Sequence, residues 1–90
     1  MEIDYLYEFS VIAQMGSFSD AVDELNISQS SLSKHIIYLE KELDIQLFNR
    51  TTRSVRLSEA GKKILPYARQ IYEIKKIIMR TVSEENNKKK

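Results

Sequence analysis

The sequence contains no cysteine, two glycines and a single proline among its 90 residues. Without cysteine, neither a disulfide framework nor a thiolate metal site can form, and the composition fits a reducing compartment such as the cytoplasm. The two glycines, Gly16 and Gly61, are too few to build a glycine-rich phosphate-binding loop. No apolar run approaches the roughly 20 residues of a membrane-spanning helix, so we expect no membrane partner.

Catalytic and metal-binding patterns are missing as well. His35 is the only histidine, and no sequence pattern joins it to Ser33 and Asp44 as a triad. No group of histidine and acidic residues has metal-ligand spacing. We therefore expect a protein that is not an enzyme, needs no cofactor or metal, and uses His35 structurally or leaves it in solvent. A small enzyme or metal protein is the weakest alternative.

Basic residues are absent from the start of the chain. Residues 1–27 hold six acidic residues and no lysine or arginine, although the formal net charge of the whole chain is +1. Residues 28–57 hold five basic residues against three acidic ones, and residues 58–90 hold nine against four. This asymmetry favours contact with a polyanion through one part of the molecule, and ordinary solvated charge explains it equally well by itself.

Three helices are predicted before residue 44. Apolar residues recur at helical spacing behind Asp4, a candidate N-cap, and Gly16 ends that helix. Ser17 is the N-cap of a short second helix, and Ser28 is the N-cap of a third helix over residues 28–43. The inner stripe of the third helix consists of Leu32, Ile36, Leu39 and Leu43. A short helix joined by a tight turn to a longer one is a helix-turn-helix.

The periodicity then changes from helical to alternating. Val55 and Leu57 alternate with Arg56 behind the basic, turn-like segment NRTTRS, which predicts a β-hairpin with its tip at residues 49–54. A hairpin in this place is the wing of a winged helix-turn-helix. We therefore expect a mainly α fold with three helices, a two-stranded β wing and a long C-terminal dimerisation helix.

The outer face of the third helix carries small polar residues. If Leu32 faces the core and each residue turns by about 100°, Ser30 and Lys34 lie on the opposite side. Hydroxyl side chains allow a duplex to approach closely, and they offer donors and acceptors to base edges and phosphates. The pattern predicts a recognition helix in the major groove of DNA, with an elaborate helix cap as the alternative.

The segment from Ser17 to Gly61, SFSDAVDELNISQSSLSKHIIYLEKELDIQLFNRTTRSVRLSEAG, resembles the N-terminal DNA-binding domain of LysR-type transcriptional regulators, without a gap. The resemblance implies a winged helix-turn-helix and a linker helix that pairs antiparallel with its twin in a homodimer. By the family motif, DNA contacts fall on Gln29, Ser30, Ser33 and Lys34 in the recognition helix and on Arg50, Thr52 and Arg53 in the wing.

The chain departs from the family pattern at several positions. Val22 replaces an alanine, which is a mild core change. Asp44 replaces the usual glycine before the wing, and aspartate tolerates a positive φ less well than glycine does. Lys34 stands where arginine is common, which removes bidentate guanine recognition. Ile37 and Tyr38 replace basic or polar residues, which reduces phosphate contact, although Ile37 could meet a thymine methyl group.

Ser58 is the predicted N-cap of a final helix over residues 59–83, in which Pro66 is expected to cause a bend and not a stop. A domain of this size cannot cover so long an apolar stripe, so we expect a homodimer. Packing of the helix on its own domain is the alternative. The predicted dimerisation residues are Ile64, Tyr67, Ile71, Ile74 and Ile78.

Taken together, these patterns predict a winged helix-turn-helix DNA-binding domain over residues 1–58, a linker and dimerisation helix over 59–83 and a disordered tail over 84–90. The expected function is sequence-specific binding of double-stranded DNA at an inverted-repeat operator, in transcription regulation in the bacterial cytoplasm. The alternative is a protein-interaction module that no longer binds DNA. An effector small molecule is expected only if a C-terminal domain follows. The operator, the regulated genes and the direction of regulation stay open.

Overall fold

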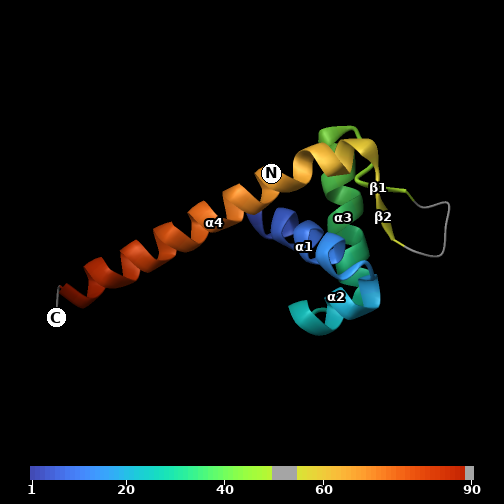
Figure 1. Cartoon of the computed structure of the whole chain (residues 1–90). Helices are drawn as coiled ribbons and strands as arrows, with labels where there is room; N and C mark the ends of the chain where they lie inside the picture. The colour runs from blue at the N-terminus through green and yellow to red at the C-terminus, as the bar shows by residue number, and fades with distance from the viewer. Residues whose placement is uncertain (50–54, 89–90) are drawn as a thin grey trace.

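The computed structural model describes residues 1–49 and 55–88, which form four helices and one two-stranded sheet (Figure 1). The helices are α1 (Ile3–Met15), α2 (Phe18–Leu25), α3 (Gln29–Leu43) and α4 (Glu59–Lys88), and the strands are β1 (Phe48–Asn49) and β2 (Arg56–Leu57). This order confirms the mainly α, winged helix-turn-helix fold that the sequence predicts.

The first helix begins earlier than expected. Its N-cap is Glu2, which makes no side-chain capping bond, so the prediction of Asp4 as the cap is wrong. Asp4 lies instead in the first turn, where its carboxylate interacts favourably with the positive end of the helix dipole. Gly16 ends the helix as predicted: its φ is 69° and its N–H donates to the Ile12 carbonyl at 2.8 Å.

Serine caps start the next two helices, as the sequence predicts. Ser17 Oγ accepts a hydrogen bond from the Asp20 N–H at 3.2 Å, and Ser28 Oγ accepts one from the Ser31 N–H at 3.1 Å. Between these helices the chain turns at Asn26, whose left-handed φ of 57° closes α2 through a bond to the Val22 carbonyl. The cap and the turn bring α2 and α3 together as a helix-turn-helix.

The core lies between the first three helices, the first part of α4 and the base of the wing. The inner stripe of α3 is buried as predicted at Leu32, Ile36 and Leu39. The Phe48 ring on β1 meets the Phe9 ring edge-on at 5.4 Å and the Phe18 ring at 5.9 Å. Phe48 therefore joins the wing to both α1 and α2. The large side chains that are almost completely buried are Phe9, Phe48, Ile12, Leu32, Ile36, Leu39 and Leu47.

The base of the wing is held by the start of α4. β1 and β2 pair antiparallel, with Phe48 opposite Leu57. The Ser58 N–H donates to the Leu47 carbonyl at 2.9 Å, and Ser58 Oγ accepts from the Gly61 N–H at 2.9 Å. Ser58 is thus the predicted N-cap, and it also joins the hairpin to the last helix.

The last helix is continuous through Pro66 and ends at Lys88. Residues 84–88 are therefore helical, and the expectation of disorder over this part of the tail is wrong. An existing helix adds residues without a new nucleation step, and Glu85 and Lys88 form an i,i+3 ion pair at 3.4 Å. Residues 89–90 of the expected tail lie outside the described residues.

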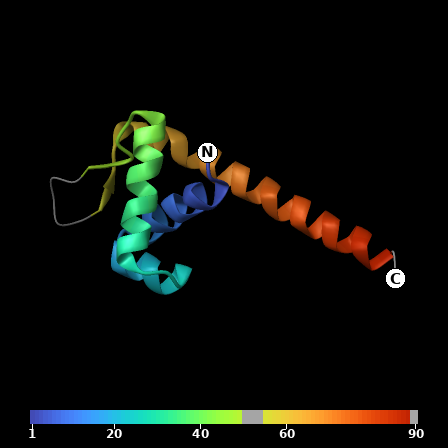
Figure 2. The ribbon, with the colours of Figure 1, turned by 180° about the vertical axis from the view of Figure 1, so that it is seen from behind.

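Within the described residues, α4 packs on the rest of the protein only as far as Lys75. Tyr72 stacks on Tyr7 of α1 with ring centroids 3.9 Å apart, and Lys75 pairs with Asp4 at 2.5 Å. Beyond this contact the helix leaves the other elements and ends far from the wing (Figure 2). The described residues therefore form an elongated body of 54 × 25 × 20 Å.

Asp44 ends α3 with a φ of 56°, the conformation for which glycine is best suited. We expect Asp44→Gly to raise the free energy of unfolding by about 0.5–1 kcal/mol, because glycine relieves the left-handed strain. Asp44→Ala should lower it, since alanine tolerates this region less well than aspartate. Urea unfolding of the three proteins tests the order, and a glycine variant no more stable than the alanine variant would contradict it.

Candidate nucleic-acid interface

The outer face of α3 is open to solvent. Gln29, Ser30 and Lys34 are exposed and Ser33 is half-buried, while the opposite side of the helix is buried in the core. Ser30 and Lys34 lie one helical turn apart, so their side chains share a face. This is the arrangement that a recognition helix needs: a fixed inner side and an uncovered outer side.

The first turn of α3 is rich in short hydroxyl groups. Ser28 Oγ lies 3.2 Å from Ser30 Oγ and donates to Ser31 Oγ at 2.9 Å. These bonds hold small side chains close to the helix, so that the positive end of the helix dipole stays accessible to an anion. The start of α3 is accordingly suited to meet a phosphate or a base edge at short range.

A polar cluster that sequence reasoning missed fixes α3 against α1. His35 Nδ1 lies 2.7 Å from Glu8 Oε1, and the Tyr5 ring stacks on the His35 ring at 4.1 Å. The expectation of a structural His35 holds, but its partner is 27 positions away and follows no spacing rule. The cluster keeps the orientation of α3, because it joins a flank of the helix to a second helix.

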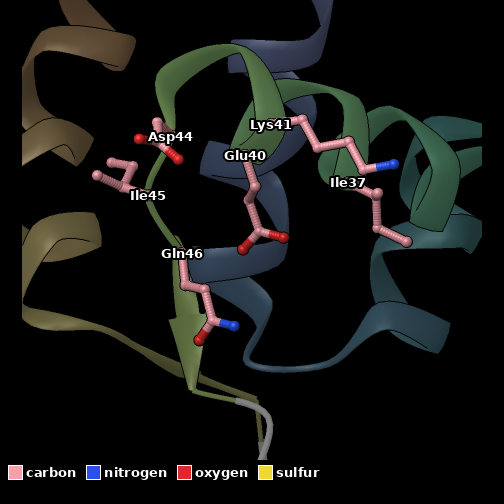
Figure 3. Close-up of a pocket in the computed structure, with 6 residues that line it drawn as sticks. All are labelled: Ile37, Glu40, Lys41, Asp44, Ile45 and Gln46. Carbon is pink, nitrogen blue, oxygen red and sulfur yellow. The ribbon is translucent and has the colours of Figure 1, made fainter.

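A shallow hollow separates the second half of α3 from the segment that leads into the wing (Figure 3). Glu40 reaches across this gap, and its Oε2 accepts a hydrogen bond from the Leu47 N–H at 2.8 Å. The bond ties α3 to β1 and holds the Glu40 carboxylate toward the wing segment. The residues that line the hollow are Ile37, Glu40, Lys41, Asp44, Ile45 and Gln46.

The wing carries the second group of predicted DNA contacts. Arg50, Thr52 and Arg53 lie outside the described residues, so their roles remain predictions. Arg56 on β2 is exposed opposite Asn49, while Val55 and Leu57, with which it alternates, are half-buried. The paired strands thus place a cation on the surface at the base of the hairpin.

The predicted dimerisation residues fall into two groups. Ile64 and Ile71 are half-buried and pack against the core of their own domain, whereas Tyr67, Ile74 and Ile78 are exposed. The spacing of these residues along the sequence could not distinguish the two groups, because α1 covers only one side of the first part of α4. Three further apolar side chains extend the exposed group: Ile77, Met79 and Val82.

Three polar groups at or beside the contact between α1 and α4 have raised pKa values. Burial raises the pKa of Tyr7 above its usual value, and the neighbouring Tyr72 raises it further. The hydrogen bond to Asp4 raises the pKa of Lys75, and the bond to Glu73 raises the pKa of Lys76. Each of these two ion pairs thus favours the charged form of its lysine.

Over residues 1–49 and 55–88, no helix combines the length and apolar character needed to cross a membrane. The same part of the chain contains no group of three or more histidine and acidic side chains placed to hold a metal ion.

The model of the bacterial regulatory helix-turn-helix protein, lysR family, matches residues 3–62. The transcriptional regulator ShiR of Corynebacterium glutamicum (strain R) is 48% identical over 71 residues, which are 79% of this chain and 24% of ShiR. The uncharacterized regulator YbhD of Escherichia coli (strain K12) is 44% identical over 70 residues, 78% of this chain and 22% of YbhD. The chain thus spans about a quarter of the length of these relatives.

Solved structures share the fold over almost the whole chain. The BenM_DBD/catB site 1 DNA complex superposes with a TM-score of 0.88 at 31% identity, covering 96% of this chain and 97% of that one. The C206S mutant of Corynebacterium glutamicum OxyR superposes with a TM-score of 0.89 at 34% identity, covering 94% of this chain and 26% of OxyR. With the family match running from α1 into α4, this chain belongs to the lysR family of bacterial regulatory helix-turn-helix proteins.

Proposed function

We propose that the chain is the sequence-specific, double-stranded DNA-binding domain of a bacterial transcriptional regulator, and that α3 enters the major groove. The observation that carries this proposal is the outer face of α3, which is mostly polar, slim and uncovered while the inner face is buried at Leu32, Ile36 and Leu39. Likeness to BenM_DBD, whose structure is a complex with catB site 1 DNA, supports DNA binding by this chain.

The proposed contacts divide between base recognition and anchoring. Residues of the recognition helix read base edges and neighbouring phosphates through hydroxyl, amide and ammonium groups. The wing residues bind the DNA backbone, and Arg53 reaches toward a minor groove. The helix contacts are Gln29, Ser30, Ser33 and Lys34, and the wing contacts are Arg50, Thr52 and Arg53.

We further propose a homodimer on an inverted-repeat operator, with residues 1–58 as the DNA-binding unit and α4 as the linker and dimerisation helix. Exposed Tyr67, Ile74 and Ile78 support this, because α4 leaves its own domain with an uncovered apolar stripe. Ile64 and Ile71 border the stripe and contribute to the domain core. Such a regulator acts in the cytoplasm without catalysis, and an effector would bind only to a further domain.

The first test separates anchoring from base recognition, using preferred sites selected from a random DNA pool. Arg53→Ala should weaken binding to specific and random DNA alike and reduce the salt slope by about one, because one phosphate contact is lost. Ser33→Ala should mainly relax preference at one position, where a base contact contributes about 1–3 kcal/mol. Gel shifts at several salt concentrations measure both. If both variants lost the same affinity for specific and for random DNA, the division between anchoring and base-reading residues would be contradicted.

A second candidate function is protein interaction through a helix-turn-helix that has lost DNA binding. The exposed Ile37 and Tyr38 on α3 and the net charge of +1 favour it. A gel shift against genomic fragments at low salt distinguishes the two functions. Retarded, sequence-dependent bands support DNA binding, and their complete absence supports the interaction module.

A further inference from the structure

One apolar side chain interrupts the polar outer face of α3. Ile37 is 42% exposed and lies one turn beyond Ser33 and Lys34. At about 100° per residue, Ser30, Lys34, Ile37 and Lys41 fall within a sector of about 60° on the side opposite Leu32. Isolated exposed isoleucines are common on protein surfaces, but this one lies at the centre of the proposed DNA-contacting face.

The fold itself does not require an isoleucine at this position. The inner side of α3 is already filled by Leu32, Ile36 and Leu39, which are completely buried. Ile37 belongs neither to this core cluster nor to the partly buried hydrophobic residues that pack against it. A β-branched residue is also a weaker helix former than the straight-chain residues common on helix surfaces. Its packing within the chain therefore gives no reason for an apolar group.

The surroundings of Ile37 suit a duplex. Lys34 and Lys41 lie one turn before and one turn after it on the same face, and Lys41 extends beside Ile37 at the rim of the hollow (Figure 3). The nearest acidic side chain on its own helix, Glu40, is bonded to the Leu47 N–H on the wing side. Ile37 is thus an apolar spot between two cations, which matches a base edge between two phosphate backbones.

We propose that Ile37 is a specificity-determining residue that contacts the 5-methyl group of a thymine in the major groove. The inference rests on the proposed function, since it requires α3 to lie in that groove. Thymine alone among the four bases presents a methyl group there, and apolar side chains recognise it by contact. Lys34 can donate to thymine O4 and to guanine O6 alike. A contact of Ile37 with the methyl group would distinguish thymine from the other bases, which the hydrogen bond of Lys34 alone does not do.

The geometry also limits where this thymine lies. Ile37 is three residues from Lys34, which is about 4.5 Å along the helix axis. Successive base pairs are about 3.4 Å apart. The thymine read by Ile37 therefore lies one or two base pairs from the position read by Lys34, in each half of an inverted repeat.

The test replaces individual thymines of a selected site by deoxyuridine, which removes only the methyl group. One methyl contact corresponds to about fourfold in affinity per half-site and about 15-fold when both half-sites are changed. The 90-residue chain should show this loss at one symmetric thymine position. Ile37→Ala should bind the thymine and deoxyuridine sites within about twofold of each other, and Ile37→Val should keep most of the difference.

Tyr38→Ala is the matched control, because it removes a neighbouring exposed apolar side chain from α3. The Tyr38 ring is 55% exposed and meets the Tyr5 ring edge-on at 5.9 Å, on the α1 side of the helix. The Tyr38→Ala variant should keep the preference for thymine over deoxyuridine that the unmodified chain shows. Circular dichroism and thermal melting confirm that each variant is folded.

A flat deoxyuridine scan in the unmodified chain, or a methyl effect that persists in Ile37→Ala, would overturn the inference while leaving the proposed function intact. A pool selection that returns no preferred site would overturn both. Loss of self-association in Ile37→Ala, with no change in thymine preference, would assign Ile37 to a contact between copies of the chain instead.

Discussion

Gly61→Ala is expected to lower the free energy of unfolding by about 3 kcal/mol, the upper part of the usual range for overpacking. A methyl group at position 61 would lie 2.2 Å from the carbonyl oxygen of Leu47 and 3.1 Å from its carbonyl carbon. Both are backbone atoms, so no rotamer change relieves the clash. The start of α4 and the base of the wing would have to separate.

This separation would also break the contacts that hold the wing. The Leu47 carbonyl accepts the Ser58 N–H at 2.9 Å, and Ser58 Oγ accepts the Gly61 N–H at 2.9 Å. A shift of α4 away from Leu47 strains the first of these bonds, and it moves Ser58 and β2 with the helix. We therefore expect weaker DNA binding in the alanine variant even where it remains folded.

Urea unfolding, followed by circular dichroism, measures the loss in free energy of unfolding. The proteins are compared at equal concentration, because the stability of an oligomer depends on concentration. Lys62→Ala is the matched control: it changes the neighbouring residue of the same turn, which is exposed and pairs with Glu59 at 3.1 Å. Lys62→Ala should change the free energy of unfolding by less than about 0.5 kcal/mol. A Gly61→Ala protein as stable as this control would show that the close approach to Leu47 is not needed.

The second large effect is expected on assembly. Ile74→Glu combined with Ile78→Glu should convert the proposed homodimer to a monomer and weaken binding to an inverted repeat by about 100-fold or more. Ile74 is 56% exposed and Ile78 is 55% exposed, one turn apart on α4. Two carboxylates at these positions would have to be buried without partners in a helix-helix contact.

Arg80→Glu provides a control of equal charge. The double substitution and Arg80→Glu each lower the net charge by two, but Arg80 lies about 120° away from Ile74 around the helix. The control should remain dimeric in light scattering at micromolar concentration and lose less affinity. A monomeric unmodified protein, or equal losses on the repeat for both variants, would refute dimerisation through this stripe.

Local signals in the sequence predicted the start of three of the four described helices correctly. Ser17, Ser28 and Ser58 cap α2, α3 and α4 as expected, because a cap bonds to a backbone N–H three residues away. The recognition face followed equally directly, since 3.6 residues per turn assign an inner and an outer side once Leu32 is placed in the core. Asp4 failed as a cap because Glu2 adopts the capping conformation without a side-chain bond.

Contacts between distant segments gave no such signal. His35 and Glu8, and Glu40 and Leu47, are joined by hydrogen bonds of 2.7 and 2.8 Å that follow no spacing along the chain. Gly61 could be recognised as a rare glycine at the start of a helix, but the backbone that it touches could not be identified. Each of these contacts depends on how two elements pack, which periodicity does not describe.

By itself, the amino-acid sequence determined the order of the elements, the buried side of α3 and the family resemblance, because all three follow from short-range spacing and motif. Only the tertiary structure decided how the apolar residues of α4 are divided. Ile64 and Ile71 pack against their own domain, whereas Ile74 and Ile78 remain exposed. The physical reason is the place of α1, which covers only one side of α4 and follows that helix no further than the Asp4–Lys75 pair.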